Sequence, residues 1–322
     1  MKSLNHLVII VLGLALLLNS CSEDCEIIEG YFSTSPLNFE SINSEYDDYN
    51  SSYGYLEQNF TYIFSSNRNT QGEEFDIINF YAEYYFDQTS NKAYFIASTT
   101  SNSYYNNAFD KINTSFNEFG PNSLFSKDYL YEIFFYASDS NGNLDINYIT
   151  QYAWDSSWGD PARLDKLNTE YNEAYPTFTR YLDEMFFCSD KNGNYDLFYV
   201  ELSSSIINWL ETEEIPVWNT IDNLNSSSDD KCPYINGNLM IFASDRDGGF
   251  GGFDLYYSIY NNGIWSDPIN FGEEINTEYD EYRPICIYLD NYINDVMLFS
   301  SNRPGGLGGF DLYYVGIPKM ML

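Results

Sequence analysis

The sequence almost lacks histidine. His6 is the single histidine among 322 residues, and it lies in an N-terminal segment that we expect to be removed from the mature protein. A mature chain without histidine excludes Ser-His-Asp and Cys-His catalytic arrangements. It also excludes zinc and copper sites that depend on histidine ligands.

Basic residues are scarce. The chain has 14 lysines and arginines against 48 aspartates and glutamates, for a net charge of −34. Such a surface repels nucleic acids and anionic lipid headgroups, so we predict no nucleic-acid partner. The charge suits a solvated extracellular protein, a cationic partner or divalent cations, and solubility alone is a sufficient explanation.

Cysteine is also rare. Beyond Cys21 the chain has Cys25, Cys188, Cys232 and Cys286, and none of them has the spacing of a Cys-x-x-Cys motif. A secreted protein can form disulfides, but this spacing leaves the pairing of the four residues open.

Long apolar runs are absent except at the N-terminus. Leu7–Leu18 is an uncharged run of 12 residues behind Lys2, too short to span a bilayer and typical of a signal peptide. The run ends in Leu18-Asn-Ser-Cys21, which resembles the lipobox of bacterial lipoproteins, although an ordinary secretory signal with an incidental cysteine is the alternative. The resemblance implies residues 1–20 as a signal peptide and lipidation of Cys21, which would anchor the protein to the outer membrane without a spanning helix.

Acidic residues follow the lipidation site. Ser22-Glu-Asp24 resembles the surface-export signal of some Gram-negative lipoproteins, which favours the extracellular face over the periplasmic face. We therefore expect an acidic tether over residues 21–30 and one domain over residues 31–322.

The chain is rich in aromatic residues and contains an internal repeat. Its 32 tyrosines and 24 phenylalanines are typical of β-strands. Phe242–Ser258 and Phe299–Val315 are identical at 12 of 17 positions and start 57 residues apart. Three markers recur five times: Asp76, Asp145, Asp196, Asp254 and Asp311, each closing a loop; Ser66, Ser138, Ser189, Ser244 and Ser301, each in a Phe/Tyr-x-Ser-Asp/Asn motif; and Asn43, Asn113, Asn168, Asn225 and Asn276, each leading a further loop.

Each unit reads as four short strands. In the fourth unit we predict strands at Tyr234–Asn236, Leu239–Ala243, Asp254–Tyr260 and Ile264–Pro268, the first two joined by an Asn-Gly turn. The long first interval predicts an insertion within Tyr81–Asp110. The fifth unit lacks its last strand, and residues 32–43 resemble that strand, so we predict an all-β, five-bladed propeller whose ring is closed by the N-terminal strand.

These units resemble the WD40-like repeat of TolB-type propellers, in which Phe-x-Ser-Asp-Arg precedes a glycine turn and Asp-Leu-Tyr. The Gly-Gly-x-Gly-Gly-Phe-Asp-Leu-Tyr form is similar to repeats found beside peptidoglycan-binding modules in outer-membrane proteins of gliding bacteria. No such module is present in this sequence, so the resemblance does not imply cell-wall binding.

The repeated aspartates and serines are best explained as anchors of blade geometry, with aspartates accepting backbone hydrogen bonds. Arg246 and Arg303 could pair with acids of the Asn-led loops, or they could bind a partner. We expect no cofactor, but calcium is the alternative, with oxygen ligands from Asp190, Asp196, Asp245, Asp247 and Asp254. Trp154, Trp209 and Trp218 interrupt the repeat and could form a surface that stacks on sugar or peptide.

From these patterns we predict a non-enzymatic surface lipoprotein that binds or scaffolds outer-membrane or cell-surface proteins, in secretion or gliding for example. The alternatives are capture of carbohydrate or peptide for uptake and, behind that, glycoside hydrolysis. Propeller glycosidases use two carboxylates that flank the sugar, and such a pair should break the repeat at the central funnel. The sequence singles out no such pair, so we predict no catalytic residues.

Overall fold

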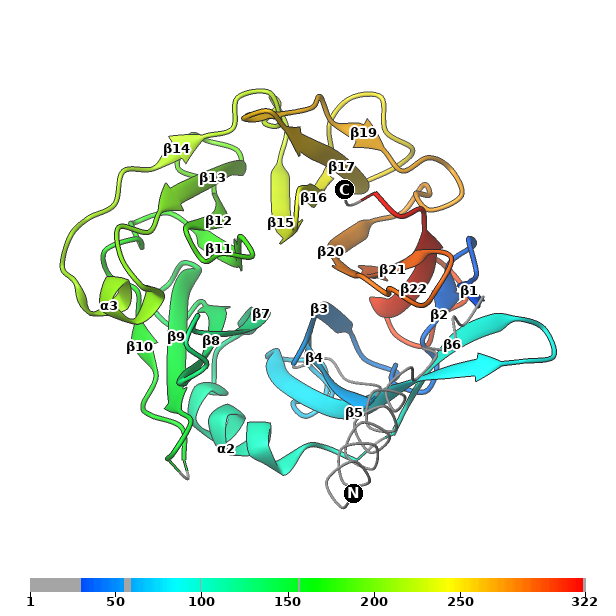
Figure 1. Cartoon of the computed structure of the whole chain (residues 1–322), viewed down its shortest axis with the longest axis horizontal. Coiled ribbons are helices and arrows are strands. Elements are labelled where there is room, and N and C mark those ends of the chain that lie inside the picture. Colours follow the sequence, from blue (N-terminus) through cyan, green and yellow to red (C-terminus); the bar gives the residue numbers. More distant parts are fainter. Residues whose placement is uncertain (1–29, 55–58, 99, 156, 321–322) are drawn as a thin grey trace, which may run out of the picture.

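The chain folds as a ring of five antiparallel sheets around a central axis, as the repeats predict (Figure 1). This computed structural model describes residues 30–54, 59–98, 100–155 and 157–320. The leader, Cys21, Cys25 and residues 21–29 of the expected tether lie outside the described residues. Within the described part, neither helix has the length and apolar character needed to cross a membrane.

Each blade has its first strand at the axis and its later strands further out (Figure 1). The first blade comprises β3 (Asp48–Tyr53), β4 (Asn59–Ser66), β5 (Asp76–Asp87) and β6 (Lys92–Ala97), and the second β7 (Glu118–Phe125), β8 (Tyr131–Ser138), β9 (Asp145–Tyr152) and β10 (Ala162–Arg163). The third comprises β11 (Glu173–Phe178), β12 (Glu184–Ser189), β13 (Asp196–Glu201) and β14 (Asn219–Thr220). The fourth comprises β15 (Asp230–Asn236), β16 (Leu239–Ser244), β17 (Asp254–Asn261), β18 (Ile264–Trp265) and β19 (Ile269–Asn270), and the fifth β20 (Glu281–Ile287), β21 (Asp295–Ser301), β22 (Asp311–Ile317) and β2 (Leu37–Asn38).

The N-terminal strand closes the ring, which confirms the prediction. Strand β2 is antiparallel to β22, with Leu37 opposite Tyr314 and Asn38 opposite Tyr313. A second N-terminal strand, β1 (Tyr31–Phe32), pairs in parallel with β6 of the first blade, which the sequence did not predict. The N-terminal segment therefore joins the last blade to the first.

The predicted insertion is a β-hairpin followed by a helix. Strand β5 is 12 residues long and forms, with β6, an arm that projects from the ring in cyan (Figure 1). Helix α2 (Ser103–Ile112) follows and buries its apolar face against the second blade, where Phe109 packs on Phe134. A shorter helix, α3 (Ile206–Glu211), covers the outside of the third blade (Figure 1).

The innermost strand of every blade contains a β-bulge at the same position. The first bulge residue has a positive φ in all five blades, and a proline follows it in four of them. These residues are Asn50 (φ 60°), Gly120 (59°), Tyr175 (58°), Cys232 (55°) and Arg283 (49°). The bulge lets a strand continue through a proline, so β15 begins at Asp230 and not after Pro233 as predicted.

The Asn residue that leads each loop cross-links two blades. Its partner is the residue after the closing Asp of the preceding blade. The side-chain oxygen of the Asn accepts from the backbone N–H of that residue, and the side-chain amide donates to its C=O. The five pairs are Asn43 with Leu312, Asn113 with Ile77, Asn168 with Ile146, Asn225 with Leu197 and Asn276 with Leu255. This contact, together with strand closure, holds the ring together.

Candidate functional site

The repeated serines bind a carboxylate that begins the innermost strand of the same blade. Each of these five acids is fully buried: Asp48, Glu118, Glu173, Asp230 and Glu281. Ser66, Ser138, Ser189 and Ser301 donate their hydroxyls to the acids of their own blades at 2.6–3.2 Å. Ser244 accepts from Arg246, which pairs with Asp230. The structure therefore places these serines at strand-to-strand contacts inside the blades.

Arginines neutralise three of the five acids. Arg246 pairs with Asp230 at 2.5 Å, Arg303 pairs with Glu281 at 2.8 Å, and Arg68 pairs with Asp48. Each arginine also donates to a backbone carbonyl of the Asn-led loop. The side chains of Arg246 and Arg303 are therefore occupied within their blades, and the structure does not bring them to a common surface with the tryptophans.

The closing aspartates hold the loops between the second and third strands in two ways. In the glycine-rich copies, Asp254 accepts from the backbone N–H of Phe250 at 2.8 Å, and Asp311 accepts from that of Leu307 at 2.6 Å. In the Asn-Gly-Asn copies the donors are side-chain amides: Asp145 and Asp196 each accept from two asparagines. In the first blade Asp76 accepts from Asn69.

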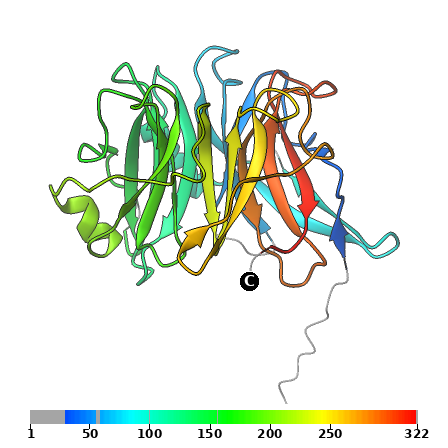
Figure 2. The same ribbon diagram turned by 90° about the horizontal axis from the view of Figure 1, so that it is seen from above.

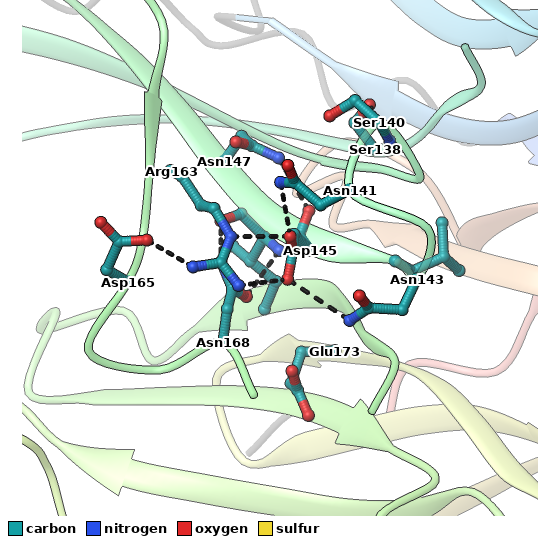
Figure 3. A network of polar contacts seen from close by, with 12 residues as sticks. Ser138, Ser140, Asn141, Asn143, Asp145, Asn147, Arg163, Asp165, Asn168 and Glu173 are labelled. Carbon is teal, nitrogen blue, oxygen red and sulfur yellow. Dashed lines mark hydrogen bonds and ion pairs between the residues drawn. The ribbon is translucent and has the colours of Figure 1, made fainter. Parts of the chain in front are cut away.

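In the second blade the arginine comes from a different position and binds the closing aspartate (Figure 3). Ser140 occupies the position of Arg246 and Arg303, and Arg163 on the outermost strand binds Asp145 through Nε at 2.6 Å and Nη2 at 2.8 Å. Glu118 is left with hydroxyl and backbone donors from Thr114 and Ser138 alone. Burial therefore raises the pKa of Glu118 to about 7.

This raised pKa predicts a pH-dependent stability. A carboxyl whose folded pKa lies above its unfolded value favours folding at low pH, and that contribution is lost as the pH rises through about 7. Replacing Glu118 with Gln removes the titration. We expect the melting temperature of Glu118→Gln relative to wild type to be higher at pH 8 than at pH 5. A difference that stays constant over this range would contradict the assignment.

The residues proposed as calcium ligands bind protein donors. Asp190 accepts from Asn172 at 2.9 and 2.6 Å, Asp196 accepts from two asparagines, and Asp245 accepts from the backbone of Asp229 at 2.8 Å. In the described residues, no group of three or more His, Cys, Asp or Glu side chains is placed to hold a metal ion. Asp247 lies exposed in the glycine-rich loop.

The tryptophans that interrupt the repeat do not form one surface. Trp154 is 80% exposed, whereas Trp209 is buried in α3 and Trp218 packs on Phe187 and Phe198 of the third blade. Cys188, Cys232 and Cys286 are buried free thiols. Trp209, Trp218 and the three cysteines therefore contribute to packing inside the ring, whereas Trp154 does not.

Aromatic side chains from several blades meet near the central axis. Tyr49 stacks on Tyr282 with ring centroids 5.3 Å apart, and Tyr175 meets Tyr282 edge-on at 6.3 Å. Arg283 is fully buried beside Tyr175. The five acids nearest the axis repeat with the blades and are satisfied within them, so the axis does not present the pair of carboxylates that a glycosidase funnel would need.

A groove lies instead between the third and fourth blades. It has a volume of about 770 Å³, within the range of ligand-binding pockets. Its walls come from the β11–β12 turn, β13 and the residues after β14 in the third blade, and from the β15–β16 and β17–β18 turns in the fourth. Because connections alternate between the two faces of a blade (Figure 2), the groove opens on the face opposite the glycine-rich loops.

A smaller hollow of about 350 Å³ extends this groove toward the axis. The two share Thr179, Arg180 and Ile235 in their walls. Together they form a continuous depression from the centre of the ring to its rim.

Aromatic rings from both blades form one wall of the groove. Phe186 stacks on Tyr199 at 5.4 Å and meets Trp265 edge-on at 6.2 Å, and Trp265 contacts Tyr260 at 5.0 Å. Tyr260 is 44% exposed, so its ring is open to a ligand. Flat exposed rings of this kind suit the apolar faces of sugar rings.

Three carboxylates line the same groove. Asp183 and Glu184 lie where the β11–β12 turn enters β12, and Asp222 follows β14. Burial raises the pKa of Glu184, and the charges of Asp183 and of Glu201, its cross-strand neighbour, raise it further. Asp183 and Asp222 are exposed and accept hydrogen bonds from the hydroxyls of Thr179 and Thr220. The groove thus combines a carboxyl group that retains its proton to higher pH with two carboxylates in water.

The sequence matches no protein-family model, and no curated protein matches it. Solved structures share its fold: an α-L-arabinofuranosidase from Podospora anserina is 13% identical, with a TM-score of 0.50 over 89% of this chain and 96% of that chain. The catalytic domain of a GH62 α-L-arabinofuranosidase from Coprinopsis cinerea is 14% identical, with a TM-score of 0.50 over the same shares. The GH43 protein BlXynB from Bacillus licheniformis is 10% identical, with a TM-score of 0.53 over 87% of this chain and 54% of that chain.

These similarities correct our prediction of a non-enzymatic scaffolding protein. That prediction was wrong because the structures that share this propeller over most of the chain are glycoside hydrolases. A TolB from Agrobacterium tumefaciens also matches, with a TM-score of 0.38, which is too low to carry an argument. At these identities the similarity establishes the five-bladed propeller, and the activity has to be argued from the groove.

Sequence reasoning missed every carboxylate of the groove. The predicted functional residues lie in the repeated loops and among the tryptophans, whereas Asp183 and Glu184 lie at the β11–β12 turn and Asp222 follows β14. One signal was available: Glu184 aligns with Leu239 and Val296, each five residues before the repeated serine of its blade, so an acid at this position is not part of the shared pattern.

Proposed function

We propose that this protein is a glycoside hydrolase that cleaves oligosaccharides in the groove between its third and fourth blades. The observation that carries the proposal is the raised pKa of Glu184 inside a groove walled by aromatic rings. A carboxyl group that keeps its proton to a higher pH than usual can donate it to the departing glycosidic oxygen.

The second carboxylate would act from the exposed side of the groove. Asp222 follows β14 and Glu184 begins β12, so the third blade brings both carboxyl groups to the groove from different strands, and we expect a bound sugar to contact both. An ionised aspartate in that place can activate a water molecule or attack the anomeric carbon, which are the two established ways of completing glycoside hydrolysis. Asp183 is adjacent in sequence to Glu184, and its negative charge raises the pKa of Glu184.

The charge of the protein limits the substrate class. With a net charge of −34 and three acids in the groove, the site repels uronic acids and sulfated sugars. Arg180, exposed where the groove meets the axial hollow, is the one basic residue among those that line the groove, and Lys127 lines the hollow. We therefore expect neutral oligosaccharides, and the fold shared with arabinofuranosidases supports pentose-containing glycans as the first to assay.

Attachment to the outer membrane through Cys21 and a TolB-type ancestry of the repeat remain predictions from the sequence. Both are compatible with the proposed hydrolase, because an enzyme tethered at the cell surface meets its glycan outside the cell.

The binding part of the proposal is tested by removing an exposed ring. Tyr260→Ala should weaken binding of a cleaved or competing oligosaccharide about tenfold, because a stacked aromatic ring contributes roughly 1.4 kcal/mol or more. Tyr171→Ala is the matched control, since Tyr171 is 43% exposed, like Tyr260 at 44%, but lies outside the groove. Calorimetry would measure both. Equal affinities for the two variants would place the ligand elsewhere.

A further inference from the structure

Arg283 is a buried cation without a carboxylate partner. Its side chain is fully buried, whereas four other arginines of the described chain pair with aspartate or glutamate and Arg180 is exposed. Moving an isolated charge out of water is costly unless an opposite charge or a full set of hydrogen bonds compensates. Neither is provided by the described residues around Arg283.

The guanidinium reaches across the propeller axis. It starts on the fifth blade, and Nη2 donates to the carbonyl of Pro121 on the second blade at 3.3 Å. Nη1 donates to the carbonyl of Pro233 on the fourth blade at 3.5 Å, and the ring of Tyr175 on the third blade lies 5.4 Å away. Both hydrogen bonds are longer than the usual 2.9–3.0 Å. Nε has no partner.

The remaining blade contributes a second unsatisfied group. Asn50 is fully buried, and both its side-chain oxygen and its side-chain nitrogen lack a partner. Asn50 holds the bulge position in the first blade that Arg283 holds in the fifth, and the residues before them, Tyr49 and Tyr282, stack on each other. The unpartnered amide and the unpartnered guanidinium thus lie at one level of adjacent innermost strands.

We propose that a small monovalent anion, with chloride as the test case, binds on the propeller axis between Arg283 and Asn50. Arg283 Nε–H and the Asn50 amide N–H would donate hydrogen bonds to the ion. Its single negative charge would balance the positive charge of the guanidinium. A cation is excluded by the charge of Arg283. A bulky oxyanion is disfavoured by the surrounding rings of Tyr49, Tyr175 and Tyr282.

The other titratable groups at this level are neutral. Burial raises the pKa of the Cys232 thiol to about 12 and raises the pKa values of Tyr49, Tyr175 and Tyr282 above their ordinary range. None of them therefore supplies the missing negative charge near neutral pH. The ion would connect all five blades, and we expect it to stabilise the ring without taking part in the groove.

Bromide provides the direct test, because it replaces chloride and scatters anomalously. Crystals of the wild-type protein grown in sodium bromide should show an anomalous peak within hydrogen-bonding reach of Arg283 Nε and Asn50 Nδ2. Peaks confined to the surface, or an axis occupied by water alone, would overturn the proposal.

A matched variant makes the test independent of crystals. Asn50→Asp places a carboxylate beside Arg283 at a position whose positive φ aspartate tolerates. Wild-type melting temperature should rise with chloride in place of gluconate at constant ionic strength, since a ligand bound only by the folded state stabilises it. The response should disappear in Asn50→Asp. A wild-type melting temperature that is the same in both salts would count against the ion, as would a variant that still responds.

Discussion

Replacing Glu184 with Gln should lower the rate of glycoside hydrolysis by about 100-fold to 10,000-fold, the usual contribution of a positioned general acid. The carboxamide has nearly the same shape and keeps the surrounding contacts, but it cannot donate a proton to the leaving oxygen. Oligosaccharide affinity should therefore change little while kcat falls. Steady-state kinetics on a chromogenic pentoside, together with calorimetry on the natural oligosaccharide, measure both quantities.

The control for this prediction is Glu170→Gln. Glu170 is an exposed acid in an Asn-led loop, on the face opposite the groove, so its replacement changes the same chemistry without touching the site. We expect wild-type kinetics from it. If Glu184→Gln and Glu170→Gln were equally active, Glu184 would not be the proton donor.

The pH dependence of the rate gives an independent check. The charge of Glu201 helps to raise the pKa of Glu184, so Glu201→Gln should lower that pKa and move the alkaline limb of the rate profile to lower pH. Activity would persist, because Glu201 itself lies outside the groove. If the alkaline limb did not move, the pH dependence of the rate would not be due to Glu184.

Loss of the N-terminal closure should be the largest effect on stability. Phe39 is 1% exposed and packs on Tyr62, Phe95 and Tyr314, and its backbone N–H donates to Leu312. Truncation of such a residue creates a cavity between the first and last blades, so Phe39→Ala should lower the free energy of unfolding by roughly 3–5 kcal/mol. Chemical denaturation measures this directly.

Deletion of residues 22–40 extends the same argument to the whole segment. It removes β1 and β2 and leaves β22 as an edge strand, so the amide of Tyr314, which faces β2, should lose protection in hydrogen exchange. Phe116→Ala is the control, because Phe116 is 44% exposed and should change stability by less than about 0.5 kcal/mol. Unchanged stability after the deletion would show that the N-terminus does not close the ring.

The repeat allowed the fold to be predicted in some detail. Spacing of the closing aspartates and Asn-led loops determined the number of blades, and the similarity of residues 32–43 to a fourth strand predicted the pairing of Leu37 with the last blade. The parallel addition of β1 to β6 was not predictable, because a two-residue strand has no periodicity to detect. The bulges escaped prediction for a related reason: a strand is expected to begin after Pro233 unless the positive φ of the preceding residue is known.

The candidate site was much harder to predict from the sequence. Its walls come from five turns and strand ends of two blades, and only the packed ring brings Glu184 and Asp222 of the third blade to one groove with Trp265 of the fourth. The raised pKa of Glu184 depends on burial and on its pairing with Glu201, neither of which a sequence displays. The repeated residues were the clearest signal in the sequence, but they make the structural contacts that every blade needs.

The central claim is that an oligosaccharide binds between the third and fourth blades with its glycosidic oxygen at Glu184. The most direct measurement is a crystal structure of the Glu184→Gln variant with an uncleaved pentose-containing oligosaccharide. Our account predicts a sugar ring stacked on Tyr260 or Trp265, with the glycosidic oxygen within hydrogen-bonding distance of the residue 184 side chain and Asp222 on the other side. A sugar bound among the glycine-rich loops, or an empty groove at saturating oligosaccharide, would contradict it.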